Sequence, residues 1–206
     1  MKSVGIIDYL AGNAKSVQNA FKKLNIKAEF INSPEQILNA SAIILPGVGS
    51  AGATMDSLKS MNIIKALDEA LNIKNTPFLG ICIGMQVLFE NSEEDGADCL
   101  GFLKGKVKRF DKSLRIPQIG WNSVDFVIKD DPLIKDCQNP EYFYFVNSYY
   151  AVPENKDVIL SVTDYGKDFC SAVRYKNIAA TQFHLEKSGA AGLKILKNFA
   201  DFAEVL

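Results

Sequence analysis

Cys82 has the surroundings of a reactive thiol. It lies in Gly80-Ile81-Cys82-Ile83-Gly84, between an apolar run (77–81) and a helix-like stretch, Met85 to Glu90. Glycines on both sides allow a strand to turn sharply into a helix, which exposes the side chain at the carboxyl end of the strand. The N–H groups and positive dipole end of the following helix favour thiolate over thiol. This pattern, a nucleophile elbow, predicts covalent chemistry by Cys82.

A thiol nucleophile needs a base, and His184 is the only histidine in the chain. A neutral imidazole can take the thiol proton, stabilise the thiolate as imidazolium, and later protonate the leaving group. Glu186 lies two residues further on, and in an extended segment such residues point to the same side. It could therefore orient the imidazole. The alternative is a structural histidine beside an unrelated glutamate; the elbow favours a Cys82, His184, Glu186 triad.

Tetrahedral intermediates also need hydrogen-bond donors for their oxyanion. The backbone N–H of Ile83, directly after the nucleophile, is one candidate. The loop Pro46-Gly47-Val48-Gly49 follows a predicted strand that would lie beside the elbow. Its glycines leave the backbone accessible, so Val48 and Gly49 are candidates for the second donor.

The same loop contains a G-x-G-x-x-G match over residues 47–52. In a dinucleotide-binding fold, an acidic residue about 20 positions later should end a strand. Here Asp68 and Glu69 fall inside a helical stretch. Nucleotide binding is therefore not favoured.

The elements that must position these residues alternate in the first half of the chain. Apolar runs predict strands at Val4 to Ile7, Ala28 to Ile31, Ala42 to Leu45 and Phe78 to Ile81. Helical spacing predicts helices over Asn13 to Leu24 and Met55 to Leu71. Such alternation predicts a parallel sheet covered on both faces, with its active site beyond the carboxyl ends of the strands.

The second half is rich in short β-type runs broken by turn residues. We expect strands, several of them antiparallel, at Val124 to Ile128, Tyr142 to Val152, Val158 to Val162, Cys170 to Tyr175 and Ala179 to Phe183. A closing helix, Ala190 to Ala203, would place Leu193, Leu196 and Phe199 on one stripe. The predicted fold is α/β: one domain (1–206) with a flavodoxin-like, mostly parallel central sheet, flanking helices and antiparallel strands in the second half.

Composition narrows the class of protein. A formal net charge of -1 provides no electrostatic footprint for nucleic acid or an anionic membrane. The longest mostly apolar stretch (77–89) is too short to span a bilayer, and the amino end lacks a signal-peptide core, so we expect a cytoplasmic protein. No C-x-x-C pair or zinc-ligand spacing occurs, so we expect neither disulfides nor a metal. Outside the elbow, the cysteines read as small buried hydrophobes: Cys99, Cys137 and Cys170.

Five blocks together resemble the class I glutamine amidotransferases, and within them the glutaminase subunits of imidazole glycerol phosphate synthase. In chain order they are Pro46 to Gly49, Gly80 to Gln86, Pro117 to Asn122, Tyr144 to Tyr149 and Gln182 to Ser188. The elbow and the His-x-Glu segment identify the class. The Pro-Gln-Ile-Gly-Trp-Asn block points to the subfamily, and the similar start at Ile7-Asp8-Tyr9 extends the match over nearly the whole chain.

The resemblance implies hydrolysis of the glutamine side-chain amide to glutamate and ammonia, without a cofactor. Cys82 would attack the amide carbon, His184 would protonate the departing ammonia, and water would cleave the glutamyl thioester. The residues implied to hold the substrate are Gly49, Gln86, Glu94 and Ser148. Without the resemblance, Glu94 would read as part of a solvated acidic loop (90–95).

A partner is also implied, because free ammonia is mostly protonated in neutral water and then cannot act as a nucleophile. In the resembled subfamily the partner is a cyclase subunit with a (β/α)8-barrel fold. The residues implied to face it are Asn13, Trp121, Tyr144 and Lys187. Taken singly, they read as a helix cap, two core aromatics and a solvated cation.

Two residues depart from the resembled pattern. Leu185 stands where proline is usual, which is expected to loosen the link between His184 and Glu186. Asn147 replaces a histidine and cannot titrate near neutrality. These departures keep open a paralogue that supplies ammonia to another synthase, such as one forming an amidino-sugar. A non-hydrolytic regulatory subunit and a cysteine peptidase are further alternatives; the intact triad opposes the first, and the Gly84-Met85-Gln86 and 117–122 blocks oppose the second.

Overall fold

The computed structural model describes residues 3–9 and 13–205 of the 206-residue chain. Its parallel half contains five strands in the order β2-β1-β3-β4-β13, all paired in parallel. Their bounds are β1 Val4–Ile7, β2 Ala28–Ile31, β3 Ala42–Leu45, β4 Phe78–Ile81 and β13 Ile178–Thr181. The four strands predicted in the first half are confirmed at both ends. The parallel pairing places the carboxyl ends of β3, β4 and β13 side by side.

Mostly antiparallel strands extend this sheet from β13, as predicted for the second half, although β5 pairs in parallel with β7. The order continues β12-β10-β7-β5-β6, and β11, β8 and β9 branch from β12. Their bounds are β5 Asn91–Ser92, β6 Ala97–Asp98, β7 Gly105–Arg109, β8 Gln118–Phe126, β9 Glu141–Asn147, β10 Tyr149–Pro153, β11 Ile159–Asp164 and β12 Asp168–Tyr175. The run predicted as one strand over Tyr142 to Val152 is thus two strands. β9 pairs only with β8, whereas β10 joins the main sheet between β7 and β12, so the chain changes partner at Ser148.

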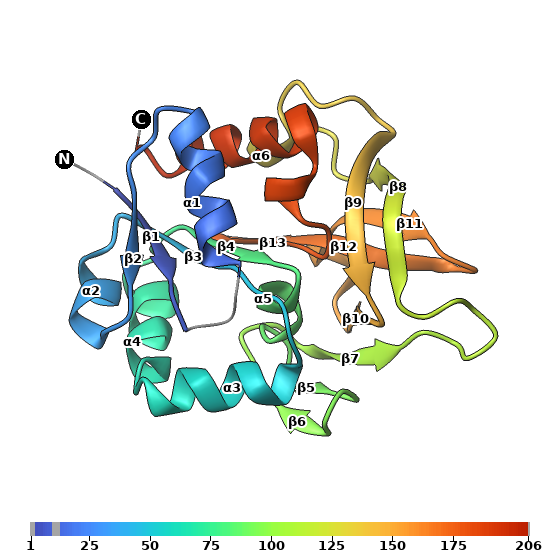
Figure 1. Cartoon of the computed structure of the whole chain (residues 1–206), viewed down its shortest axis with the longest axis horizontal. Coiled ribbons are helices and arrows are strands. Elements are labelled where there is room, and N and C mark those ends of the chain that lie inside the picture. The colour runs from blue at the N-terminus through green and yellow to red at the C-terminus, as the bar shows by residue number, and fades with distance from the viewer. Residues whose placement is uncertain (1–2, 10–12, 206) are drawn as a thin grey trace.

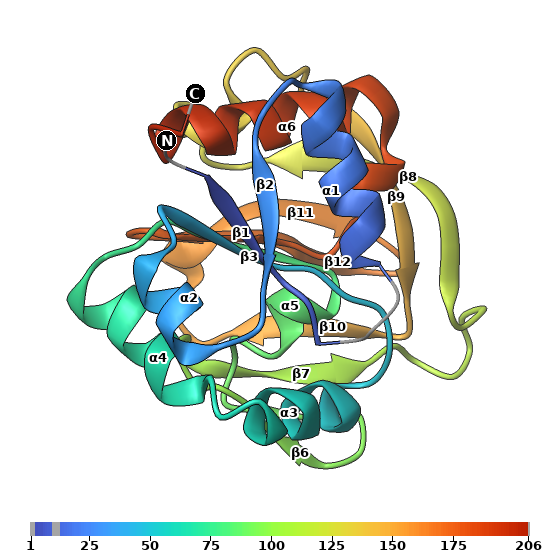
Figure 2. The same cartoon turned by 60° about the vertical axis from the view of Figure 1, so that its left-hand side comes forward.

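Helices cover both faces of the parallel half (Figures 1 and 2). Helices α1 (Ala14–Lys23) and α6 (Gly189–Phe202) lie together on one face, and α2 (Pro34–Asn39), α3 (Ala51–Ser60) and α4 (Ile64–Asp68) lie on the other. The strands alternate between these layers, since side chains in a strand point to opposite faces. Ile44 in β3 packs in the core under α1 and α6, whereas Ile43 and Leu45 pack in the core under α2 to α4.

Two helical predictions need correction, and one helix was not predicted. The region Met55 to Leu71 is two helices, because Asn62 adopts a left-handed φ of 55° that ends the first; α4 then runs into a π-helical turn, Glu69–Ile73. Helix α2 was not expected, although Ser33 caps it and Pro34 opens it. The stretch Met85 to Glu90 is not a helix. Helix α5 covers only Ile83–Gln86, because the Glu90 N–H donates to the Gly105 carbonyl and draws the chain to β7.

Short 3-10 helices complete the fold, at Pro132–Ile134, Lys156–Val158 and Leu185–Lys187. The last of these follows β13 directly and contains the predicted glutamate of the triad. Within the described ranges, none of the helices combines the length and the apolar character needed to cross a bilayer.

Candidate active site

Cys82 lies at the turn between β4 and α5 in a strained backbone conformation. Its φ of 55° and ψ of −108° fall in a region that non-glycine residues rarely occupy, and such strain concentrates at functional sites. The flanking glycines are required by close packing. A Cβ on Gly84 would lie 1.9 Å from the Leu45 carbonyl oxygen, and one on Gly80 would lie 2.5 Å from the Gly84 carbonyl oxygen. The predicted elbow is therefore present, and it presses against β3.

The helix after the elbow is too short to supply a large dipole. Helix α5 has four residues, whereas a macrodipole needs many aligned peptide units. The dipole of this helix therefore contributes little to stabilisation of the Cys82 thiolate, contrary to the expectation from the sequence. Stabilisation of the thiolate must come from neighbouring side chains and backbone groups.

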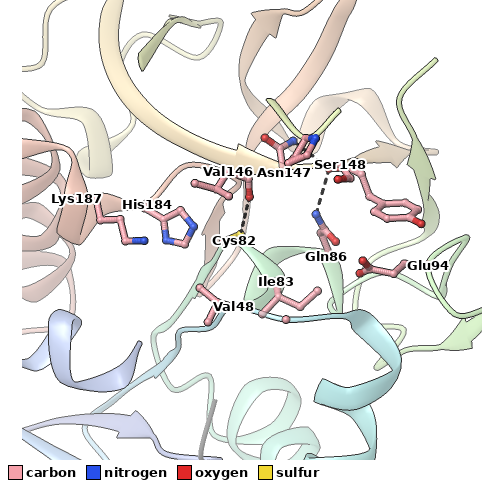
Figure 3. A pocket seen from close by; sticks show the side chains of 13 residues that line it. Val48, Cys82, Ile83, Gln86, Glu94, Val146, Asn147, Ser148, His184 and Lys187 are labelled. Carbon is pink, nitrogen blue, oxygen red and sulfur yellow. Dashed lines mark hydrogen bonds between the residues drawn. The ribbon is translucent and has the colours of Figure 1, made fainter. Parts of the chain in front are cut away.

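His184 and Glu186 form a buried pair. The Nδ1 atom of His184 lies 2.8 Å from Oε1 of Glu186, and both side chains are at most 1% exposed. A carboxylate can only accept, so Nδ1 carries a proton. The other ring nitrogen, Nε2, is buried without a hydrogen-bond partner among the described residues. In Figure 3 the ring lies beside Cys82, so Nε2 is the atom available to take the thiol proton.

Charge is stabilised on both members of this pair. Burial alone would lower the pKa of His184, but its interactions with Cys82 and Glu186 outweigh burial and raise the pKa to about 10. Burial likewise opposes ionisation of Glu186, yet hydrogen bonds from His184 and Asn13 keep its pKa below the usual value. These shifts favour the imidazolium and carboxylate forms, so Nε2 keeps a proton that it takes from the Cys82 thiol. Leu185 does not open the pair: its side chain is fully buried, and the 2.8 Å contact is kept.

Asn13 lies away from the surface, contrary to the expectation that it faces a partner. It is 5% exposed, and its side-chain amide donates to Oε1 of Glu186. It stands at the N-cap position of α1 but makes no side-chain capping bond. The amide is committed to Glu186 instead, so Asn13 belongs structurally to the triad.

A cavity of about 270 Å³ opens over Cys82. It is lined by Val48, Gly49, Cys82, Ile83, Gln86, Glu94, Pro117, Val146, Asn147, Ser148, Tyr149, His184 and Lys187. All four residues expected to hold the substrate and all three expected to form the oxyanion hole are in this set. His184 and Lys187 lie on one side of the thiol, and Gln86 and Glu94 on the other (Figure 3).

Glu94 is not a solvated loop residue. Its Oε2 accepts the backbone N–H of Ala51 at the start of α3. Burial raises the pKa of its carboxyl, although the Ala51 N–H acts in the opposite direction. A half-buried carboxylate in the cavity wall is suited to pair with a cationic group of a ligand.

The loop that carries Val48 and Gly49 is held by Tyr9. The Tyr9 hydroxyl donates to the Pro46 carbonyl at 2.9 Å. Gly47 packs directly against that hydroxyl, where a Cβ would lie 1.7 Å from Oη. Packing against Tyr9 thus explains why glycine is needed at position 47, and the G-x-G-x-x-G match does not require a bound nucleotide.

The other three residues expected at a partner surface lie together beside the cavity. Trp121 is 57% exposed on β8, opposite Tyr144 on β9, and their rings meet edge to face. The ammonium group of Lys187 lies 6.0 Å from the Tyr144 ring centroid. Trp121 and Tyr144 are therefore not core aromatics; they form an apolar surface next to the mouth of the cavity.

Sequence reasoning assigned no role to two residues that the structure brings to the site. One is Tyr9, whose position could not be inferred from the chain alone. The other is Gln182, a fully buried side chain whose Nε2 lies 3.6 Å from the Cys82 sulfur. The expectation of an extended segment around His184 would have included Gln182, two residues before it, but the structure has a bend after β13 and a 3-10 helix at Leu185–Lys187 instead.

The comparisons with known proteins agree with this site. The family model described as glutamine amidotransferase class-I matches residues 5–202. The chain belongs to the class-I glutamine amidotransferase family. The "Imidazole glycerol phosphate synthase subunit HisH" of Dehalococcoides mccartyi is 48% identical over 97% of each chain. The chloroplastic "Imidazole glycerol phosphate synthase hisHF" of Arabidopsis thaliana is 44% identical over 95% of this chain and 33% of its own length.

Solved structures of the family share the fold at low sequence identity. A structure titled "Crystal structure of glutamine amidotransferase" superposes with a TM-score of 0.77 at 19% identity, covering 98% of each chain. This match confirms the predicted fold class of a mixed parallel and antiparallel sheet flanked by helices.

Proposed function

We propose that this chain is the glutaminase subunit of an imidazole glycerol phosphate synthase in histidine biosynthesis. It hydrolyses the side-chain amide of glutamine and passes the ammonia to a cyclase subunit. The observation that carries the proposal is the buried His184–Glu186 pair beside a strained elbow cysteine, in a chain 48% identical to a HisH subunit.

The chemistry follows from the positions of the three side chains. The Cys82 sulfur attacks the amide carbon of glutamine, and charge develops on the amide oxygen. In this proposal, the N–H of Ile83 and an N–H of the Val48–Gly49 loop, which line the cavity, stabilise that charge. His184, as imidazolium, gives its Nε2 proton to the departing ammonia. A water then attacks the glutamyl thioester, with Nε2 accepting its proton, and glutamate leaves.

Glu186 and Asn13 act behind His184. The Glu186 carboxylate keeps the proton on Nδ1, so that Nε2 alone faces the thiol, and it stabilises the imidazolium. The Asn13 amide holds this carboxylate in place. The orientation of the ring is thus determined by contacts from two distant parts of the chain.

The opposite side of the cavity suits the amino-acid end of glutamine. Glu94 supplies a carboxylate for the α-ammonium group. Ser148 and Gly49 are proposed to contact the rest of the amino-acid end of glutamine. Gln86 lies between this side and the thiol. A glutamine held by Glu94 would reach Cys82 with its side-chain amide.

The proposed partner is a cyclase subunit with a (β/α)8-barrel fold, seated on the surface formed by Trp121, Tyr144 and Lys187. Trp121 is the exposed apolar residue of that surface, and exposed aromatic residues are common at the centre of protein interfaces. The surface adjoins the mouth of the cavity, so a partner there could receive ammonia without its release to water. The Arabidopsis protein named hisHF, three times as long as this chain, supports such a partnership.

The test is glutamate release from glutamine by the purified chain, alone and with the cyclase subunit from the same source. We expect the cyclase to raise the rate strongly and Cys82→Ala to abolish it. Trp121→Ala should weaken the stimulation, and Val127→Ala, which alters another exposed apolar residue, should not. An unchanged rate with cyclase, together with a Cys82-dependent glutamyl adduct, would indicate a different ammonia acceptor. No turnover and no adduct would refute the triad.

A further inference from the structure

Gln182 connects the nucleophile to a buried hydrogen-bond network. Its Nε2 donates to the Cys82 sulfur at 3.6 Å, and its Oε1 accepts Nε2 of Gln86 at 2.9 Å. The Gln86 Nε2 also donates to the Tyr149 carbonyl at 3.2 Å. Gln182 is fully buried and Gln86 is 4% exposed, so neither amide exchanges these partners for water.

The direction of this relay is fixed at its far end. A backbone carbonyl can only accept, so the contact with Tyr149 must be made by the NH2 group of Gln86. The same NH2 group then meets Gln182, which must present its oxygen to Gln86. The NH2 group of Gln182 is therefore the one that faces Cys82. The Tyr149 carbonyl thus determines that the sulfur meets a donor and not an acceptor.

Among the described residues, the other groups around Cys82 act on the sulfur differently from Gln182. The Val146 carbonyl, 3.8 Å from the sulfur, can accept from a thiol but repels a thiolate. Among the charged and titratable groups, His184 lies beside the sulfur, with Glu186 behind it. Lys187 and Glu94 line opposite sides of the cavity, and the Tyr9 phenol, in the segment after β1, donates to the Pro46 carbonyl of the neighbouring loop. Helix α5 is too short for its dipole to replace a donor.

We propose that Gln182 is a hydrogen-bond donor to the Cys82 thiolate, held in its donating orientation by Gln86 and the Tyr149 carbonyl. The inference deepens the proposed function, on which it rests. The two contacts of the sulfur act in opposite directions. The Val146 carbonyl favours the thiol, and Gln182 together with His184 favours the thiolate. Removal of the Gln182 donor therefore makes ionisation of Cys82 harder.

The pH dependence of Cys82 alkylation by iodoacetamide tests the proposal, because only the thiolate reacts. The full chain is labelled between pH 5 and 10, and mass spectrometry of the peptide that contains Cys82 separates it from the other three cysteines. Gln182→Met keeps the side-chain volume and removes the donor. Loss of a hydrogen bond to a charged group corresponds to an upward midpoint shift of about 1–2 pH units.

Two further variants keep the test decisive. Gln86→Met frees the Gln182 amide to rotate, so it should also move the midpoint upwards while leaving Gln182 in place. Asn177→Ala removes buried amide hydrogen bonds to the Leu71 and Thr76 carbonyls at the amino end of β13, the end of the sheet opposite to Cys82, and should leave the midpoint at the wild-type value. An unchanged or lowered midpoint in folded Gln182→Met overturns the proposal. If Gln182→Met does not fold, an unchanged midpoint in Gln86→Met overturns it.

Alkylation needs no glutamine, so the two proposals can fail separately. A shifted midpoint in a chain that releases no glutamate would keep the role of Gln182 and remove the glutaminase. Glutamate release with an unchanged midpoint in Gln182→Met would support the glutaminase and overturn the proposed role of Gln182.

Discussion

The side-chain amide of Asn13 donates to the Glu186 carboxylate, across 173 residues of sequence. Asn13 precedes α1, and Glu186 lies in the 3-10 helix after β13, so the contact joins the start of the fold to its end. Asn13 occupies the N-cap position of α1, but its side chain makes this contact with Glu186 instead of a capping hydrogen bond to its own helix. A residue that gives up a local bond for a buried carboxylate positions that carboxylate.

Substitutions of Asn13 should therefore impair catalysis more than folding. Asn13→Ala removes a hydrogen bond to a charged group, worth about 1.5–3 kcal/mol, so we expect kcat to fall at least about tenfold. Asn13→Asp sets a second carboxylate against Glu186 and should lower kcat further. Asn19→Ala, an exposed change in the same helix, is the control. Steady-state glutaminase assays measure the effect, and wild-type kcat in Asn13→Asp would contradict the assigned contact.

The single histidine allows its titration to be followed directly by NMR. The folded pKa of His184, about 10, exceeds the ordinary value of 6.5. A raised pKa contributes stability that is fully present below about pH 6.5 and is lost as the pH rises through about 10. Glu186→Gln removes the carboxylate that favours the imidazolium, so the pKa should fall, and the loss of unfolding free energy should be smaller and complete at a lower pH. The same midpoint in wild type and Glu186→Gln would contradict the buried ion pair.

The parallel half of the fold was predictable because its strands are short apolar runs separated by helical periodicity. The elbow was equally visible, since glycine spacing around Cys82 is a local signal. The division of Tyr142 to Val152 at Ser148 was not, because a continuous β-type run does not show which neighbours it pairs with. The burial of Asn13 and the reach of Tyr9 to Pro46 depend on contacts between distant segments, which no local pattern encodes.

Gly84→Ala should prevent the elbow from closing. The added Cβ would lie 1.9 Å from the Leu45 carbonyl oxygen, and backbone on both sides cannot move aside. We expect a loss of about 3 kcal/mol or more in unfolding free energy. Gly96→Ala is the matched control: its φ is 58° but no atom lies within 4 Å of the added Cβ, so the cost is about 1–2 kcal/mol. Denaturant unfolding compares the two, and equal losses would contradict the packing of Gly84 on β3.

Tyr9 is expected to act on turnover without acting on the nucleophile. Its hydroxyl holds the Pro46 carbonyl and so the loop with Val48 and Gly49, which is proposed to stabilise the oxyanion. Burial raises the pKa of the phenol to about 12, so it remains a donor throughout the range in which the triad works. Tyr9→Phe removes only the hydroxyl.

The result expected for Tyr9→Phe is a fall in kcat of about tenfold, since a less ordered loop places its N–H groups less well on the developing charge. Alkylation of Cys82 forms no oxyanion, so its rate and pH midpoint should stay at the wild-type values. Tyr175→Phe, a partly exposed tyrosine at the end of β12, controls for loss of a phenol elsewhere. Alkylation that slows in parallel with turnover would place the effect of Tyr9 on the elbow instead of the loop, because both reactions require the thiolate and only hydrolysis requires the oxyanion donors.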